Sequence, residues 1–218
     1  MTSTAISLQE SEEMQMKMNL PNKLSVIRLC MVPVFVVIMM ASDALWANLV
    51  GCALFGLAAF TDMLDGKIAR KYNLVTDFGK FLDPLADKFM VIGALLVILY
   101  KVMGDESING IFTTVFFWTV MIVIFRELAV TSIRLVVSGS AGIVVAANML
   151  GKIKTCVQIA CVVICILERA IYAALPEAPA FATYLPVSLV LSGLMLIFTL
   201  WSGINYIASY WKYMDPDK

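Results

Sequence analysis

The chain has 218 residues, of which 61% are apolar and only 15% are charged, and its 16 basic and 16 acidic residues cancel near neutral pH. With a mean hydropathy of +0.89, this composition excludes an ordinary soluble protein, in which about a quarter of the residues are charged. The zero net charge gives no support for binding to nucleic acid. Because the sequence contains no histidine, proton transfer near neutral pH must use a carboxylate, lysine, tyrosine, cysteine or water.

The first 20 residues are polar and include Glu10, Glu12, Glu13 and Lys17. They fit either a short amphipathic helix lying along the membrane surface or a disordered tail. We expect no cleavable signal peptide, because the first apolar run is long enough to remain as a membrane span. We therefore divide the chain into a polar N-terminal extension, 1–20, and one six-helix transmembrane domain, 21–218, which carries any catalytic groups.

Apolar runs of about 20 residues recur along the rest of the chain, and a helix needs this length to cross a hydrocarbon core of about 30 Å. We predict an all-α integral membrane protein with six transmembrane helices. Their expected ranges are roughly 24–41, 45–66, 81–103, 111–135, 150–174 and 185–211, with boundaries uncertain by a few residues.

Basic residues are distributed unevenly between the two ends of these predicted helices. Of the 16 lysines and arginines, all but Lys101 and Arg169 fall on the side of the two termini. Because cytoplasmic segments of membrane proteins are enriched in lysine and arginine, both termini are predicted to be cytoplasmic. An even number of spans agrees with this orientation.

Four aspartates stand where the second predicted helix ends and the third begins. In the first group, Asp62, Asp65, Gly66, Ala69 and Arg70 are spaced i, i+3, i+4, i+7 and i+8, so they share one helical face. The small residues on that face would let a ligand lie flat against the helix.

The second group, Gly79, Asp83 and Asp87, follows at i, i+4 and i+8 and again forms one stripe. The polar segment 71–78 between the groups reads as a turn, and Pro84 is expected in the first turn or two of the next helix. Folding this hairpin would bring two aspartates from each helix toward one point.

Converging carboxylates at a membrane edge need neutralisation, because two like charges about 4 Å apart repel by about 4 kcal/mol at an effective dielectric of 20. One solution is an ion-pair network with neighbouring arginine and lysine side chains. The other is a hard divalent cation, since oxygen ligands without histidine or cysteine favour Mg²⁺, Mn²⁺ or Ca²⁺ over zinc. Two such ions would form a clamp for phosphoryl transfer and would bind a phosphate-bearing substrate.

The complete pattern, Asp62-x-x-Asp65-Gly66-x-x-Ala69-Arg70, then eight residues, then Gly79-x-x-x-Asp83-x-x-x-Asp87, resembles the signature of the CDP-alcohol phosphotransferases. The resemblance implies a six-helix fold, usually homodimeric, in the bacterial inner (cytoplasmic) membrane. The site is then expected to open to the cytoplasm and sideways to membrane lipids.

The same resemblance implies a role for each matching residue. Asp62, Asp65 and Asp83 would ligate two Mg²⁺ or Mn²⁺ ions, and Asp87 would help to hold the second ion and act as general base. The CDP moiety of the donor would be lined by Gly66, Ala69, Arg70 and Gly79. The implied reaction is attack of an alcohol on the β-phosphorus of CDP-diacylglycerol, with release of CMP.

Segments 19–33, 125–134 and 147–155 resemble, in particular, the bacterial family members that use sn-glycerol 3-phosphate as acceptor. Its phosphate needs cations, and Arg126, Arg134 and Lys152 are our candidates because arginine suits phosphate geometry and Lys152 starts the next helix. Lys154 follows closely. All of these cations could instead reach lipid headgroups or set the orientation of the chain.

Several alternatives remain open from the sequence. Glu127 is expected to orient an arginine rather than react, and Arg28 could contact the donor or pair with an acid. A sister transferase using inositol phosphate, serine or another alcohol would carry the same signature. An intramembrane prenyltransferase and a divalent-cation transporter are more distant possibilities, since the acids cluster within one hairpin at one membrane edge.

Overall fold

The computed structural model describes the backbone of residues 20–72, 77–141 and 149–210, and side chains for 22–64, 79, 82, 84–134 and 149–210. Its elements are α2 (Leu20–Ala41), α3 (Leu45–Tyr72), α4 (Asp77–Met103), α5 (Gly110–Ala141), α6 (Met149–Ala174), the short 3₁₀ helix η1 (Ala180–Tyr184) and α7 (Pro186–Tyr210). No strand occurs among these described residues. The prediction of an all-α chain is confirmed, whereas the expected helix within 1–20 lies almost entirely outside the described residues.

Each predicted apolar segment corresponds to one long helix, but the acidic hairpin is more helical than expected. Helix α3 continues to Tyr72 and α4 already begins at Asp77. Pro84 therefore lies in the third turn of α4, and its expected place in the first or second turn was wrong. The polar residues extend the helices because a helix satisfies its own backbone hydrogen bonds both within a membrane and at its edge.

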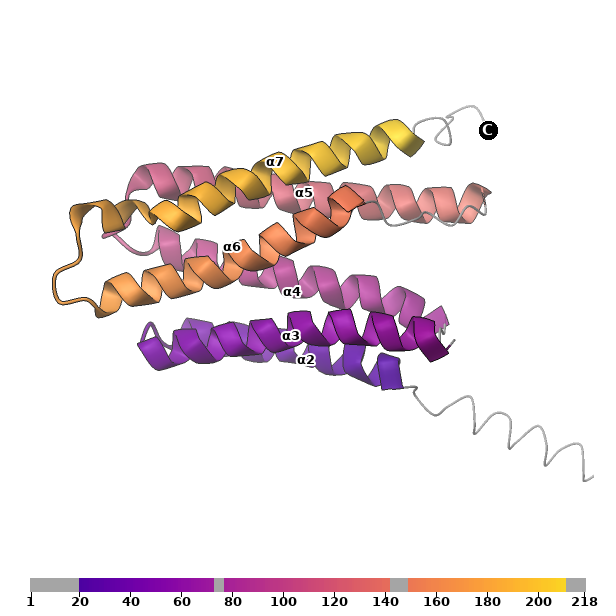
Figure 1. Ribbon diagram of the computed structural model, residues 1–218, viewed down its shortest axis with the longest axis horizontal. Helices are drawn as coiled ribbons and strands as arrows, with labels where there is room; N and C mark the ends of the chain where they lie inside the picture. The colour runs from indigo at the N-terminus through magenta and orange to yellow at the C-terminus, as the bar shows by residue number, and fades with distance from the viewer. Residues whose placement is uncertain (1–19, 73–76, 142–148, 211–218) are drawn as a thin grey trace, which may run out of the picture.

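The long helices form two groups of three that lie side by side (Figure 1). Helix α2 packs on α3 and α4, while α7 packs on α5 and α6. Contacts of α3 and α4 with α6, and of α4 with α5, join the groups. As a result, α4 lies against four other helices, and the second half of α4 is the most continuously buried part of the chain that is described.

Among the described residues, five segments are long and apolar enough to cross a membrane: 22–41, 45–64, 110–134, 149–174 and 180–210. Helix α4 is not among them, and its described stretch 84–103 carries Asp87 and Lys88 near one end and Lys101 near the other. Its neighbours shield it, so it does not need a lipid-facing apolar surface along its whole length. The chain is therefore a multi-pass helical membrane protein by the length and composition of its helices.

At one end of the bundle, two acids pair with two cations. Asp43, in the α2–α3 connection, lies 2.9 Å from both Lys101 Nζ and Arg169 Nη1, and Arg169 Nη2 lies 3.3 Å from Asp105. The hydrogen bond from Lys101, helped by Arg169, lowers the pKa of the Asp43 carboxyl. The two cations that were predicted to lie apart from the others are thus at the same end of the bundle.

The same end contains a cap for the last helix. Glu168 of α6 accepts hydrogen bonds from the backbone N–H groups of Val187 and Ser188, at 3.1 and 2.7 Å, and from the Ser188 hydroxyl at 2.5 Å. A carboxylate at a helix N-terminus satisfies free N–H groups and is favoured by the helix dipole. Pro186, the first residue of α7, needs no such partner because it has no N–H.

Candidate active site

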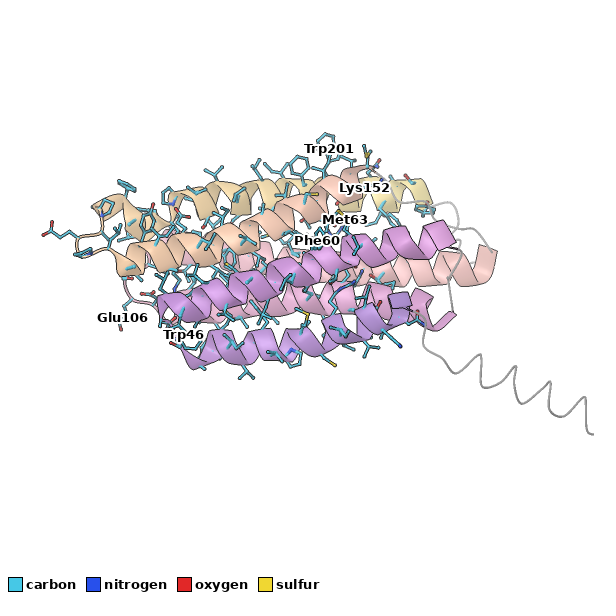
Figure 2. The ribbon with its side chains drawn as sticks, turned by 60° about the horizontal axis from the view of Figure 1, so that its bottom comes forward. Trp46, Phe60, Met63, Glu106, Lys152 and Trp201 are labelled. Atoms are coloured by element: carbon cyan, nitrogen blue, oxygen red, sulfur yellow. The ribbon has the colours of Figure 1, made fainter. Side chains whose placement is uncertain are left out.

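A cavity of about 510 Å³ opens between five helices in the half of the bundle opposite to the Asp43 cluster. Figure 2 shows two of its lining residues, Met63 of α3 and Lys152 of α6, in one half of the molecule, with Trp46 and Glu106 at the other end. The charged and hydroxyl-bearing side chains that line the cavity are Asp62, Asp87, Lys88, Arg126, Glu127, Thr131, Arg134, Lys152, Lys154, Thr155, Ser202 and Tyr206.

Five residues singled out from the sequence line this one cavity, namely Asp62, Asp87, Arg126, Arg134 and Lys152. They come from four helices, so the fold brings together side chains that are up to 90 positions apart in the sequence. Of the others, Gly79 is buried near the start of α4. The remaining candidates, Asp65, Gly66, Ala69, Arg70 and Asp83, belong to α3 and α4 but their side chains lie outside the described residues.

The acidic wall of the cavity is formed by Asp62 of α3 and Asp87 of α4. Asp62 is 39% exposed and accepts a hydrogen bond of 2.5 Å from Arg28 of α2, which is fully buried. Arg28 therefore pairs with an acid of the signature, which answers one of the questions that the sequence left open. Asp87 is within electrostatic range of Asp62, Lys88, Lys154 and Glu127, so the two walls of the cavity influence each other.

The acidic wall offers two carboxylates but no complete metal site, because no group of three or more Asp, Glu, Cys or His side chains that could hold a metal occurs among the described residues. A carboxylate offers about four lone-pair positions, so the contact of one Asp62 oxygen with Arg28 leaves further positions on that side chain for a metal. Asp87 adds a second carboxylate, and no histidine or cysteine competes because the sequence has no histidine and the lining thiol of Cys156 belongs to the other wall. Oxygen donors of this kind select Mg²⁺ or Mn²⁺ over softer metals.

The basic wall is organised around Glu127 of α5. Its Oε1 atom accepts a hydrogen bond from Arg126 at 3.3 Å and also pairs with Lys154 of α6. Glu127 and Lys154 are both buried, and a buried charge is tolerated when it is paired. The expected orienting role of Glu127 agrees with these contacts. The additional pairing of Glu127 with Lys154 could not be predicted from sequence spacing.

Helix α7 contributes residues that sequence reasoning missed. The Ser202 hydroxyl accepts a hydrogen bond of 3.1 Å from Arg126 Nη2, and a Cβ added at Gly203 would come within 3.1 Å of Arg126 Cγ. The absence of a side chain at position 203 therefore lets the arginine lie against the helix. One turn further along, the ring of Tyr206 lies 5.9 Å from the Arg134 guanidinium, within cation–π range.

A pattern that could have found these residues does exist in the sequence. Small hydroxyl residues and one tyrosine mark a single buried face of α7 at near-heptad spacing, and they are Ser188, Ser192, Thr199, Ser202 and Tyr206. In an otherwise apolar helix, such a stripe is equally typical of helix packing in membranes. Only the position of the arginines opposite Ser202 and Tyr206 distinguishes the two explanations.

The two walls together make a cavity suited to a charged, phosphate-bearing molecule. Three carboxylates and five cations line it among the described side chains, and the excess positive charge favours anions. The carboxylates Asp62 and Asp87 stand on one side, while Arg126 and Arg134 stand on the other. These features describe a polytopic helical membrane protein with a charged cavity, suited to an anionic molecule, toward one end of its bundle.

Comparison with known proteins gives the family. Residues 18–206 match the CDP-alcohol phosphatidyltransferase family. A Bacillus subtilis (strain 168) protein named CDP-diacylglycerol--glycerol-3-phosphate 3-phosphatidyltransferase is 39% identical over 206 residues, covering 89% of this chain and 96% of that protein. The chain belongs to the CDP-alcohol phosphatidyltransferase family.

Two more distant relatives carry related names. A protein of Mycobacterium tuberculosis (strain ATCC 25618 / H37Rv), named probable phosphatidylglycerophosphate synthase, is 31% identical over 192 residues, with 87% of this chain and 80% of that protein covered. An Arabidopsis thaliana protein named CDP-diacylglycerol--glycerol-3-phosphate 3-phosphatidyltransferase 2 is 31% identical over 200 residues, with coverage of 88% and 80%. The resemblance drawn from the sequence motifs is therefore confirmed at the level of the family.

Proposed function

We propose that this protein transfers the phosphatidyl group of CDP-diacylglycerol to sn-glycerol 3-phosphate, forming phosphatidylglycerophosphate and CMP in phospholipid biosynthesis. The observation that carries the proposal is the single cavity in which Asp62 and Asp87 face Arg126, Arg134 and Lys152. It supplies an acidic side for a metal-bound pyrophosphate and a basic side for the phosphate of the acceptor. The names of the bacterial relatives support this pair of substrates.

In the proposed reaction, the 1-hydroxyl oxygen of glycerol 3-phosphate forms a bond to the β-phosphorus of the donor. The bond from that phosphorus to the oxygen of CMP breaks, and CMP leaves with the bonding electrons. The proton of the attacking hydroxyl passes to the Asp87 carboxylate on the acidic wall. Such a reaction depends mainly on positioning and on neutralising charge.

A pair of Mg²⁺ or Mn²⁺ ions, held by Asp62, Asp65, Asp83 and Asp87, would neutralise the charge that develops on the phosphoryl oxygens. Arg28 fixes one oxygen of Asp62 and so orients this carboxylate. By the family signature, Gly66, Ala69, Arg70 and Gly79 would line the CDP part of the donor. On the opposite wall, Glu127 and Ser202 hold Arg126 in place for the phosphate of the acceptor.

We also propose the arrangement in the membrane. Helix α4 has 27 residues, long enough to cross at about 1.5 Å per residue, and it runs alongside helices that qualify as spans, so we count it as the sixth. The concentration of cations around the cavity supports a cytoplasmic position for the site and for both termini of the chain in the bacterial inner membrane. The family resemblance further supports a homodimer.

The test is a reaction with the purified protein, CDP-diacylglycerol, glycerol 3-phosphate and Mg²⁺, followed by identification of the lipid product and of CMP. We expect phosphatidylglycerophosphate, with loss of the reaction in EDTA and recovery on adding Mg²⁺ or Mn²⁺. Glycerol 3-phosphate should be the preferred acceptor in a panel with inositol phosphate and serine. Preference for another alcohol would show that the proposed acceptor is wrong and that the protein is a sister transferase. Metal transport into vesicles without CMP release would show that the protein is a cation transporter and not a transferase.

A further inference from the structure

The Tyr206 hydroxyl is a feature of the cavity that neither the signature nor the fold explains; the Nε atom of Arg126 is likewise buried without a hydrogen-bond partner, but other atoms of that guanidinium are bonded. Tyr206 is only 9% exposed and lines the cavity, yet its hydroxyl is buried without a hydrogen-bond partner in the described part of the chain. A buried polar atom left without a partner costs about 1–3 kcal/mol. Most buried hydroxyls in proteins are paired, so an exception within a binding cavity points to a ligand.

The ring of Tyr206 is held in place by its neighbours. The Arg134 guanidinium lies over one face at 5.9 Å from the ring centroid, and the Tyr210 ring is 4.7 Å away, centroid to centroid. A tyrosine has only two side-chain torsions, so these contacts direct its hydroxyl with little freedom left to lose on binding. The hydroxyl is therefore prepared for a contact before any substrate enters.

The surroundings of Tyr206 indicate which substrate it would meet. Ser202, one turn away on α7, holds Arg126, and Tyr206 itself carries Arg134, so the same face of α7 supports two of the cations assigned to the acceptor phosphate. The acids of the donor side belong to α3 and α4. A hydroxyl among these cations would complement a phosphate oxygen, which is a strong acceptor.

We infer that Tyr206 positions the acceptor by donating a hydrogen bond from its hydroxyl to the phosphate of the phosphorylated alcohol, beside Arg134. This inference rests on the proposed function, which supplies the phosphorylated acceptor. It makes α7 the helix that selects the acceptor. Ser202 and Gly203 contact Arg126, and the ring of Tyr206 contacts Arg134. The Tyr206 hydroxyl adds a contact that a non-phosphorylated alcohol would not use.

The decisive variant is Tyr206→Phe, which keeps the ring under Arg134 and removes only the hydroxyl. We expect the KM for glycerol 3-phosphate to rise about tenfold or more, the effect of losing one hydrogen bond to a charged group, while the KM for CDP-diacylglycerol stays the same. Thermal stability without substrate should not fall, since the hydroxyl has no partner within the described structure. The shift in melting temperature that glycerol 3-phosphate produces in the unmodified protein should become smaller.

The matched control is Tyr100→Phe, the same chemical change at an exposed tyrosine near the other end of the bundle, which should alter neither KM. The inference is overturned if Tyr206→Phe leaves the KM for glycerol 3-phosphate unchanged, changes both KM values equally, or loses stability in proportion to activity. Failure of the proposed function would look different, because the unmodified protein would then form no phosphatidylglycerophosphate at all.

Discussion

The two ends of the helix bundle use charged residues in opposite ways. Near Asp43, the carboxylates of Asp43 and Asp105 pair with Lys101 of α4 and Arg169 of α6. Glu168 accepts hydrogen bonds from the N-terminus of α7. Around the cavity, cations outnumber acids among the described side chains, and Tyr206 and Arg126 keep donor atoms without a partner there. The comparison teaches that ion pairs between segments hold one end of the bundle together, whereas the other end has a cavity with unpaired donor atoms that suit a ligand.

The largest effect is expected at the cavity end, from Asp87→Asn. This change removes the proposed proton acceptor and one metal ligand while preserving size, so turnover should fall by at least about 100-fold. Insertion into the membrane and the elution volume in detergent should match those of the unmodified protein. A variant that retained more than about a tenth of the activity would remove Asp87 from the base role.

The second-largest effect is expected from Arg126→Ala, which removes the guanidinium group that contacts Ser202 and lies against Gly203. The KM for glycerol 3-phosphate should rise by about tenfold to 100-fold, because a charged hydrogen-bonding group to phosphate is lost. The KM for CDP-diacylglycerol should change much less. Equal increases in both values, measured by CMP release, would count against a dedicated acceptor wall.

At the opposite end, Glu168→Ala should change stability rather than substrate affinity. It leaves the N–H groups of Val187 and Ser188 without their acceptor, at a cost of about 1–3 kcal/mol in the free energy of unfolding. Thermal unfolding in detergent measures this loss, and both KM values at a temperature below the transition serve as the control. A selective change in one KM would contradict the division of the bundle into a structural end and a binding end.

The smallest effect is expected from Asp43→Asn, because the carboxylate is 69% exposed and exposed ion pairs contribute less than about 1 kcal/mol. Its pKa in the folded protein lies below the ordinary value of 3.8. The ion pairs therefore stabilise the fold at pH values above 3.8 and lose their contribution as the pH falls through the lowered pKa. The difference in melting temperature between the variant and the unmodified protein should be equal at pH 7 and pH 5 and shrink in stronger acid.

Much of the architecture could be predicted because it follows from one-dimensional patterns. Apolar length gives the helices, and the spacing of Asp62 and Asp87 with their neighbours gives the acidic faces. The eight-residue interval between Arg126 and Arg134 gives two cations on nearly one face of α5, and both line the cavity. Each of these features is local to one helix or to one hairpin.

The rest depends on contacts between helices that spacing does not encode. The pairing of Arg28 with Asp62 joins α2 to α3 across 34 positions. From the sequence, Arg28 could equally contact the donor or pair with an acid. Ser202, Gly203 and Tyr206 look like ordinary packing residues until the arginines of α5 are placed against them. The early start of α4 was missed because a charged segment beside a proline resembles a turn.

The pairing of Arg28 with Asp62 also has a consequence for biogenesis. Helix α2 is synthesised before α3, and inserting α2 alone would place the Arg28 guanidinium group among apolar side chains, at a cost of up to about 2.5–3.5 kcal/mol. Its partner carboxylate comes from α3, the next segment to be synthesised. We expect α2 and α3 to enter the bilayer together as a hairpin, so that a residue of the candidate site also guides membrane insertion.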